Sequence, residues 1–399
     1  NNVHERSVDP ATRAMLLEAD RAGIETAWDR LEKQQPQCGF GQLGICCRNC
    51  NMGPCRIDPF GEGPDKGVCG ATADIIVARN LLRMIAAGAA AHSDHARDAV
   101  LAFKQMAEGK AQSYQIKDEA KLNALAAEYN ISTEDRSPEE VAIDLANVLL
   151  SEFGKQTGPI QFTRRAPPKR QKVWENAGIN PRGVDREIVE CMHRTHIGVD
   201  NDPVHILLHG LRTSISDGWG GSMIATDVQD VLFGTPTPTM SESNLGVLKA
   251  DEVNIIVHGH EPILSEMIVA AAEDPEMIDL AKKMGAEGIS VAGMCCTGNE
   301  VLMRHGVPTA GNFLQQELAV ITGAVEAMVV DVQCIMPALG NLASCYHTKF
   351  ISTSPKADFP GTVRMEYHEE EALKTARKIV KAAVENYANR DAGRINIPN

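Results

Sequence analysis

The chain has 399 residues, of which 43% are hydrophobic and only 4% aromatic, and its formal net charge at pH 7 is -14. This length predicts two or three domains, and the acidic charge disfavours binding to nucleic acid or to an anionic membrane surface. The most apolar window, LLRMIAAGAAAHS, is interrupted by Arg83 and is too short to span a bilayer, so we expect a cytoplasmic protein.

Helical patterns fill the first 235 residues. Asp9-Pro10 is a helix-start signal, and Ser137 opens another helix with a capping-box sequence. The predicted helices span about residues 72–108, 118–129, 138–153, 184–196, 203–215 and 222–232. The polar, basic segment 155–182 is predicted to be a loop, which would be either a surface connection or a patch for an acidic partner.

From about residue 250 the pattern changes to strands that alternate with helices. Apolar strands are predicted at residues 253–259, 288–293, 327–333 and 348–354. Strands of this kind, separated by helical segments, are typical of a doubly wound parallel sheet. We therefore predict an α + α/β chain, with an all-helical domain over residues 1–235 and a Rossmann-like domain over residues 236–380.

Six of the eleven cysteines lie in the segment 38–70. In a reducing compartment such a cluster indicates metal binding rather than disulfides. Four thiolates fit either a tetrahedral zinc ion or a 4Fe-4S cluster. Because zinc sites often use two CxxC pairs and this segment has one, the spacing favours the iron-sulfur cluster. The four candidate ligands are Cys47, Cys50, Cys55 and Cys69.

Cys38 and Cys46 remain after this assignment. Two sulfurs cannot complete a cluster, but a symmetric dimer that contributes two cysteines from each subunit supplies four ligands. The alternative is that both are ordinary unliganded thiols.

A second group of candidate ligands follows the predicted strands. His260, the pair Cys295 and Cys296, and Cys334 each come just after the carboxyl end of a strand. Ligands bind at that edge of an open α/β sheet. One imidazole with two or three thiolates suits an iron-sulfur, nickel or zinc site. A single cysteine there would be read as a buried core residue, but several on one edge favour a metal site.

Several motifs in this order resemble one family. They are CGFGQLGICCRNCNMGPCRI, IAAGAAAHSDHAR, FGTPTP, SNLGVLKADEVNIIVHGHEP, GMCCTGNEVLMRHG and VVDVQCIMP. Together they resemble the catalytic subunit of the nickel-containing, anaerobic carbon monoxide dehydrogenases, from about residue 10 to the last residue. The resemblance implies a homodimer that reversibly oxidises CO with water to CO2, two protons and two electrons at a Ni-Fe-S cluster.

The resemblance also implies roles for the candidate ligands. Cys47, Cys50, Cys55 and Cys69 would hold a 4Fe-4S relay cluster, and Cys38 and Cys46 would supply half of a cluster shared across the dimer. His260, Cys296 and Cys334 would bind irons of the active cluster, with Cys295 beside them. A ferredoxin-type protein is the implied electron acceptor, and an acetyl-CoA synthase subunit is a further candidate partner.

Protons released by such a reaction need a route as well. His92 and His95 lie three residues apart on one predicted helix and therefore share a face, and histidine can pass protons near neutral pH. The resemblance implies a histidine relay at this helix, shortened here because Asp98 stands where some relatives have another histidine. Asp217 matches an acid of the family that handles protons.

The resemblance implies that relatives continue into another Rossmann-like domain, with three further cysteine ligands and a lysine. We accordingly expect residues 381–399 to link to that domain, since no cysteine follows Cys345 here. Two alternatives remain: a non-catalytic iron-sulfur electron-transfer dimer, and a hybrid-cluster reductase acting on hydroxylamine-like substrates.

Overall fold

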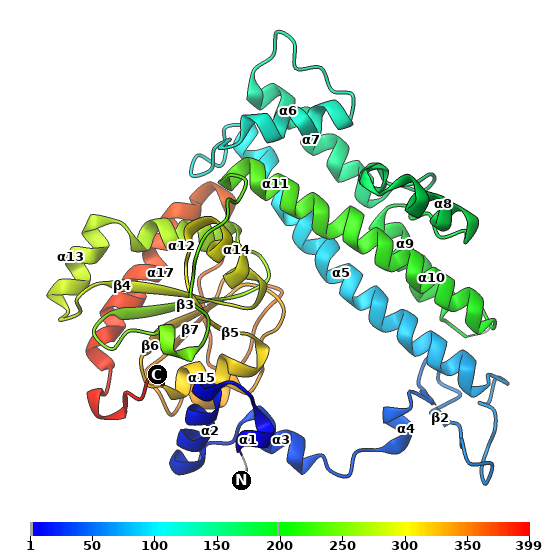
Figure 1. Cartoon of the computed structure of the whole chain (residues 1–399), viewed down its shortest axis with the longest axis horizontal. Helices are drawn as coiled ribbons and strands as arrows, with labels where there is room; N and C mark the ends of the chain where they lie inside the picture. The colour runs from blue at the N-terminus through cyan, green and yellow to red at the C-terminus, as the bar shows by residue number, and fades with distance from the viewer. Residues whose placement is uncertain (1–2, 198) are drawn as a thin grey trace. The chain divides into compact units, whose positions relative to one another are not determined.

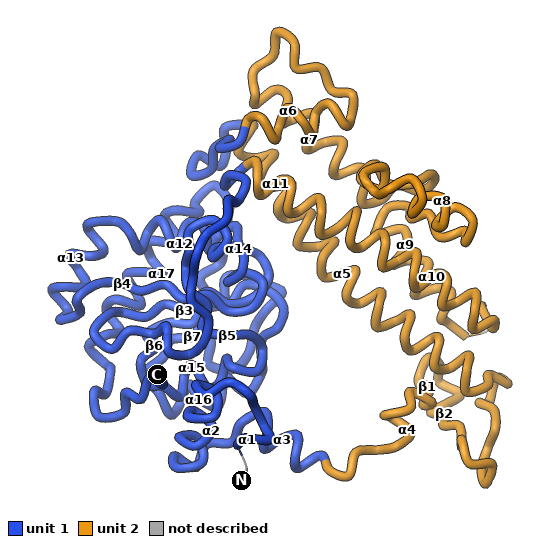
Figure 2. The backbone as a smooth tube through the Cα atoms, viewed as in Figure 1, with its two compact units in different colours: residues 1–34, 108–118, 232–399 blue, residues 35–107, 119–231 orange. Residues whose placement is uncertain are grey.

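The computed structural model describes residues 3–197 and 199–399, and these form two compact units (Figures 1 and 2). Unit 1 comprises residues 1–34, 108–118 and 232–399, and unit 2 comprises residues 35–107 and 119–231. This division differs from the predicted domains, and residues 108–118, predicted to lie in the helical domain, also belong to unit 1. The amino-terminal helices lie with the sheet, and residues 381–399, expected to be a linker, belong to unit 1.

Unit 1 is built on a six-stranded sheet in which all neighbouring strands are parallel, in the order β5-β4-β3-β6-β7-β8. The strands are β3 (Val253–Gly259), β4 (Ile289–Met294), β5 (Thr309–Gly311), β6 (Val325–Val330), β7 (Lys349–Ser352) and β8 (Val363–Arg364). The predicted parallel sheet is confirmed, with the four predicted strands as β3, β4, β6 and β7.

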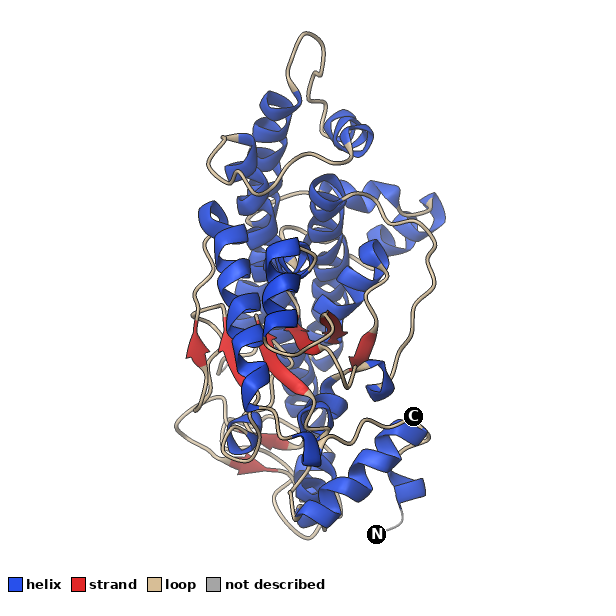
Figure 3. Cartoon of the chain, turned by 90° about the vertical axis from the view of Figure 1, so that its left-hand side faces the viewer, coloured by secondary structure: helices blue, strands red, loops and turns tan. Residues whose placement is uncertain are grey.

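Helices cover both faces of this sheet (Figure 3). They are α1 (Val3–Arg6), α2 (Pro10–Ala22), α3 (Ala27–Lys33), α12 (Ile263–Ala272), α13 (Pro275–Lys283), α14 (Cys295–His305), α15 (Gln316–Ile321), α16 (Leu339–Leu342) and α17 (Ala372–Asn386). Alternate residues of β3 serve the two cores: Ile255 and Val257 pack with α12, α13 and α17, whereas Ile256 packs with α2 and α15. Burial on both faces explains the uninterrupted apolar run of this strand.

The amino-terminal helices join unit 1 through the core on the α2 side. Met15 and Leu16 of α2 are buried in the same cluster as Leu318 of α15. The buried carboxylate of Glu317 accepts hydrogen bonds from the Ala27 backbone N–H at 2.9 Å and from the Arg30 guanidinium at 2.7 Å. These apolar and polar contacts connect residues almost three hundred positions apart in the chain.

Unit 2 is helical apart from a two-stranded hairpin. Its helices are α4 (Gly39–Gln42), α5 (Ala73–Ala107), α6 (Glu119–Glu128), α7 (Pro138–Phe153), α8 (Pro168–Asn176), α9 (Val184–Arg194), α10 (Pro203–Ser216) and α11 (Met223–Phe233), whose last two residues fall in unit 1. The hairpin strands are β1 (Cys46–Cys47) and β2 (Cys55–Arg56). The predicted loop over 155–182 is wrong in part, because Pro168 starts α8 and Trp174 packs against Ala166 and Ile179.

The long helix α5 is the centre of unit 2 and packs on α7, α9 and α10. By length and composition alone it could cross a membrane, although its apolar window was predicted to be too short. Its buried residues instead form cores with other helices of the unit, for example Leu82 with Ile206 of α10. It also buries the charged side chain of Arg79. In its most apolar window 33% of the residues are buried, and these contacts pack α5 against other helices of unit 2.

The helix α10 continues into α11 through a π-helical turn, Asp217–Ser222. Such turns occur often at functional sites. The turn passes close to α5: a Cβ added at Gly221 would lie 3.4 Å from the Cβ of His92, and one at Gly220 would lie 2.8 Å from Cδ1 of Ile160. Glycine at these positions therefore lets the turn approach its neighbours and places Asp217 beside α5.

In unit 1, one buried carboxylate ties together the chain ends that follow β3, β4 and β6. Asp331, directly after β6, accepts hydrogen bonds at 2.6 Å from the backbone N–H of His260 and at 2.6 Å from the hydroxyl of Thr297 in α14. The backbone N–H groups of Val332 and Glu261 also donate to it. Burial raises the pKa of Asp331 to about 7, although all four donors favour the charged form.

Glycine at position 259 makes this arrangement possible. A Cβ there would lie 1.8 Å from Oδ1 of Asp331, and the residue has φ +133°. Gly293 of β4 and Gly298 of α14 meet in the same way, since a Cβ on Gly293 would lie 2.4 Å from the Cα of Gly298. No larger residue fits at either contact.

We predict that Asp331→Ala destabilises unit 1. Three backbone donors and one hydroxyl would lose their buried acceptor, at a cost of about 3 kcal/mol. For a unit of this size, that corresponds to a fall of roughly 6–12 °C in the unfolding temperature. Circular dichroism recorded during heating measures the unfolding temperature. Asp358→Ala is the control, because the Asp358 carboxylate is exposed, water can replace it as the partner of Arg364 and Thr362, and its loss should leave the unfolding temperature nearly unchanged. Equal losses in the two variants would contradict the prediction.

Candidate metal centres

The hairpin of unit 2 separates the two adjacent cysteines of the cysteine-rich segment. Strands β1 and β2 pair antiparallel, with Cys46 opposite Arg56 and Cys47 opposite Cys55. Successive side chains of a strand point to opposite faces. Cys47 packs against the small core of which Ile45 is part, and Cys46 is directed to the other side. The two neighbouring sulfurs therefore belong to different surroundings.

The four cysteines predicted to share one site line a single hollow in unit 2. They are Cys47, Cys50, Cys55 and Cys69. Close backbone approach shapes this hollow: a Cβ on Gly53 would lie 3.0 Å from the backbone N of Cys55, and one on Gly67 would lie 3.5 Å from Cys55 Sγ. The Val68 N–H also points at Cys55 Sγ, at 3.4 Å. Such N–H···S contacts are typical of protein-bound iron-sulfur clusters.

The spacing of these donors distinguishes the two metal alternatives. Within residues 3–197 and 199–399, no three His, Cys, Asp or Glu side chains are close enough to hold one metal ion. A tetrahedral zinc ion, with Zn–S bonds of about 2.3 Å, needs its thiolates within roughly 4 Å of one another. A 4Fe-4S cluster keeps its ligands further apart, because irons and sulfides lie between them. In this structure the four thiols are therefore not close enough together to share one zinc ion.

A backbone N–H group and a guanidinium in the hollow outweigh the effect of burial on the Cys69 thiol. The pKa of Cys69 is lowered, first by the backbone N–H of Ala71 and then by the guanidinium of Arg79. Both effects favour the thiolate, which is the form that binds metal.

Cys38 and Cys46 lie outside this hollow. Cys38 is exposed at the start of α4, and Cys46 is half-buried on β1. Asn80 of α5 anchors the segment between them by donating hydrogen bonds to the backbone oxygens of Gly44, at 2.8 Å, and Cys46, at 2.9 Å. An exposed thiol at this place is accessible to a second molecule.

The second group of candidate ligands gathers at the carboxyl edge of the sheet in unit 1. His260 follows β3, the pair Cys295 and Cys296 begins α14 after β4, and Cys334 follows β6. These three strands are adjacent in the sheet, with β3 in the middle. An isolated bridge between Gly259 and Cys295 brings the loop of His260 to the start of α14. The structure thus places all four residues at one edge.

The backbone at this edge is strained. Cys295 and Cys334 adopt left-handed conformations, with φ +59° and +58°, and so does Gln333, with φ +65°. Non-glycine residues rarely occupy this region, and where they do the strain is often part of a functional site. Two of the strained residues carry candidate ligand sulfurs.

The thiols at the edge also repel one another when charged. Burial raises the pKa of Cys295 to about 12, and the negative charges of Cys334, Cys296 and Asp331 add to this shift. Burial likewise raises the pKa of Cys296, and the negative charges of Cys334, Glu300 and Asp331 raise it further. A bound metal cation reverses this balance, since it binds and stabilises thiolates. The donor types at this edge, one imidazole and three thiols, are ones that iron, nickel and zinc bind.

The predicted proton-handling residues meet in unit 2. His92 of α5 and Asp217 of the π-helical turn form a hydrogen bond of 2.7 Å between Nδ1 and Oδ1. This bond raises the pKa of His92. One turn further along α5, His95 accepts a hydrogen bond of 2.9 Å at Nε2 from the side-chain amide of Gln229. Asp98 follows on the same helix, half-buried.

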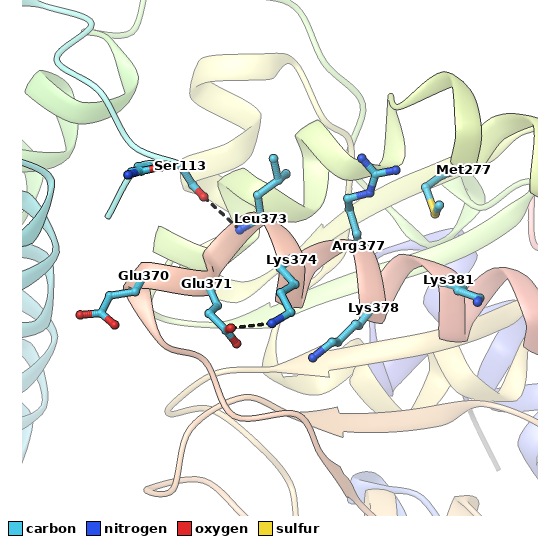
Figure 4. Close-up of a pocket in the computed structure, with 10 residues that line it drawn as sticks. Ser113, Met277, Glu370, Glu371, Leu373, Lys374, Arg377, Lys378 and Lys381 are labelled. Atoms are coloured by element: carbon cyan, nitrogen blue, oxygen red, sulfur yellow. Dashed lines mark hydrogen bonds and ion pairs between the residues drawn. The ribbon is translucent and has the colours of Figure 1, made fainter. Parts of the chain in front are cut away.

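A groove of about 680 Å³ runs along α17 in unit 1, away from the candidate ligands (Figure 4). Lys374 and Arg377 line it, but Lys374 pairs with Glu371 at 2.5 Å and Arg377 pairs with Asp274 at 2.8 Å. These ion pairs take up much of the positive charge. None of the predicted site residues lines the groove, so it is not the centre of the chemistry.

Two residues that contact these sites were not predicted, Asp331 and Arg79. Each has a weak local signal. Asp331 is an acidic residue directly after the apolar strand β6, and Arg79 interrupts the apolar run IIVARNLL at the start of α5.

Comparisons with known proteins agree with this geometry. The model of the Prismane/CO dehydrogenase family matches residues 45–398. The chain is 76% identical over 394 residues to carbon monoxide dehydrogenase 1 of Methanosarcina mazei, which covers 99% of this chain and 63% of that protein. It is 44% identical over 389 residues to the carbon monoxide dehydrogenase/acetyl-CoA synthase subunit beta of Moorella thermoacetica, covering 97% of this chain and 57% of that protein.

A solved structure is similar throughout. The nickel-free, as-isolated carbon monoxide dehydrogenase of Thermococcus sp. AM4 matches with a TM-score of 0.98 and 61% identity, over 100% of this chain and 63% of that one. The chain thus spans less than two thirds of the length of these relatives. Because the family model matches most of its residues, the chain belongs to the Prismane/CO dehydrogenase family.

Proposed function

We propose that this chain is part of a nickel-containing carbon monoxide dehydrogenase, which reversibly converts CO and water into CO2, two protons and two electrons. The observation that carries the proposal is the gathering of His260, Cys295, Cys296 and Cys334 at one sheet edge, after three adjacent strands. Relatives named for this activity, at 76% and 44% identity, support it. Because the chain spans 63% of the more similar relative, further ligands would come from the part of the protein outside it.

At this edge, His260, Cys296 and Cys334 would hold irons of a Ni-Fe-S cluster, with Cys295 beside them. When bound, such a cluster supplies a Lewis acid for water and a soft metal for CO. Other residues of the chain hold the segments that carry these ligands in place. Asp331 fixes the loop of His260 and the start of α14, and the apolar cores beneath the edge keep water out of the sheet.

The electrons would leave through clusters held in unit 2. The four cysteines of the hollow would bind a 4Fe-4S relay cluster, and Cys38 and Cys46 would meet their counterparts in a second copy to hold a shared cluster. A homodimer in the cytoplasm, a ferredoxin-type acceptor and, by analogy with the acetyl-CoA synthase-linked relative, an acetyl-CoA synthase subunit complete the proposal.

Protons would move along α5. The carboxylate of Asp217 stabilises the charged imidazole of His92 through their 2.7 Å hydrogen bond, so that His92 can take up and release a proton at Nε2 near neutral pH. His95 lies one turn away on the same helix and is oriented by Gln229.

The proposal is tested on the full-length protein purified without oxygen. We expect nickel as well as iron in the metal analysis, and reduction of a viologen dye that depends on CO. Iron without nickel and without turnover would indicate a non-catalytic electron-transfer protein. Reduction of hydroxylamine without CO oxidation would instead indicate a hybrid-cluster reductase.

We predict that Cys296→Ser lowers CO-dependent viologen reduction by at least about a hundredfold, because a ligand of the active cluster is lost. The electron paramagnetic resonance signal of the relay cluster should persist, since its ligands lie in the other unit. Cys345→Ser is the matched control: this thiol is exposed and has no assigned ligand role, so activity should be unchanged. An active Cys296→Ser enzyme would exclude the ligand assignment.

We also predict that Asp217→Asn shifts the pH dependence of CO oxidation. The pKa of His92 is raised by Asp217, so its loss lowers that pKa and moves the acidic limb of the rate profile to lower pH. Asp185→Asn is the control, because Asp185 also contacts α5, through Ser93 at 2.6 Å and through Arg97 at 2.5 Å. A uniform fall in rate at every pH, with no displacement of the limb, would argue against a proton-handling role for the pair.

A further inference from the structure

A permanent positive charge is buried beside the four-cysteine hollow. Arg79 of α5 is only 1% exposed and belongs to the largest fully buried side chains of the protein. Its neighbours on the inner side of the helix are apolar, including Ile76, Ala78 and Leu82. A guanidinium stays charged in any protein environment, so its burial carries a large desolvation cost that some partner must offset.

Among the described residues, the oxygen atoms that accept hydrogen bonds from Arg79 are neutral. Nη2 of Arg79 donates to the backbone oxygen of Asp200, at 3.1 Å, and to the side-chain oxygen of Asn201, at 2.7 Å. Nε is buried and has no hydrogen-bond partner. In the part of the chain that the structure describes, no carboxylate forms an ion pair with Arg79. The contacts hold the side chain in place but leave its charge uncompensated.

The negative charge that would compensate it lies in the hollow. Arg79 lines this hollow together with Cys47, Cys50, Cys55 and Cys69. Its guanidinium also forms a hydrogen bond with the side chain of Cys69. Four thiolates around a 4Fe-4S core outweigh the positive charge of the iron and sulfide, so the bound cluster is an anion. Because Arg79 and the four cysteines line the same hollow, a cluster bound there would form an ion pair with the guanidinium.

We propose that Arg79 is a positioning residue that sets the reduction potential of the relay cluster, as its buried counter-ion. The proposal rests on the proposed function, in which these four cysteines hold a 4Fe-4S cluster. Reduction adds one electron to the cluster and no proton, so the anion gains one negative charge. A fixed cation nearby, in a medium of low dielectric constant, stabilises the reduced state more than the oxidised state. Arg79 therefore makes the cluster easier to reduce and a better acceptor for electrons.

The test measures the midpoint potential of the relay cluster in the full-length, cluster-loaded protein, by redox titration with mediator dyes followed by electron paramagnetic resonance. For Arg79→Gln we expect at least a tenfold fall in the equilibrium constant for reduction, which is a shift of about 59 mV to more negative potential for one electron. Arg79→Lys keeps the charge and should shift less. Arg97→Gln is the matched control, since it removes a cation from the same helix about 27 Å away and should leave the potential unchanged.

A second variant covers the case in which Arg79→Gln fails to fold or to load its cluster. Asn201→Asp leaves Arg79 in place but sets a carboxylate against Nη2, where the amide oxygen lies at 2.7 Å. Pairing the guanidinium in this way should also move the potential to a more negative value. A loaded Arg79→Gln or Asn201→Asp protein whose potential matches that of the unchanged protein overturns the inference. Absence of any 4Fe-4S signal from the unchanged protein would instead overturn the proposed function.

Discussion

The hydrogen bonds to Asp331 are the constraint on which the sheet edge of unit 1 depends. This one carboxylate accepts from the loop after β3, from α14 after β4 and from the residue after β6, so it fixes three neighbouring chain ends to one another. The left-handed backbone at Cys295, Gln333 and Cys334 costs energy and persists only where surrounding contacts leave no alternative. Glycine at 259, 293 and 298 removes the side chains that would keep these segments apart.

The regular parts of the fold were predictable because their signals are local. The apolar run of β3 is buried on both faces, and the helix over 138–153 begins at the capping box of Ser137 and Glu140. Short elements carry no such signal: β8 has two residues, too few to show a period. The helix α8 was missed because Pro167-Pro168 in a basic segment resembles a loop, although proline also starts helices. The placement of α2 and α3 depends on contacts with α15, which no local pattern reveals.

The candidate ligands were predictable in the same way, and their supporting residues were not. Cysteine spacing and position after a strand are properties of short stretches of sequence. Asp331 acts through Thr297 and His260, which are 34 and 71 residues away, and Arg79 is held by Asn201, which is 122 residues away. A single acidic residue after a strand, or a single arginine in an apolar helix, has many structural explanations. Only the tertiary contacts show that each of these residues lies beside a group of cysteines.

The two groups of cysteines differ in the charge that offsets the repulsion between their thiolates. In unit 2 the protein itself supplies a cation, Arg79, which already favours the thiolate form of Cys69. In unit 1 burial raises the pKa values of Cys295 and Cys296, and the negative charges of Cys334 and Asp331 add to both shifts. Thiols must lose their protons to bind metal. The sheet edge therefore has to obtain its positive charge from the metal.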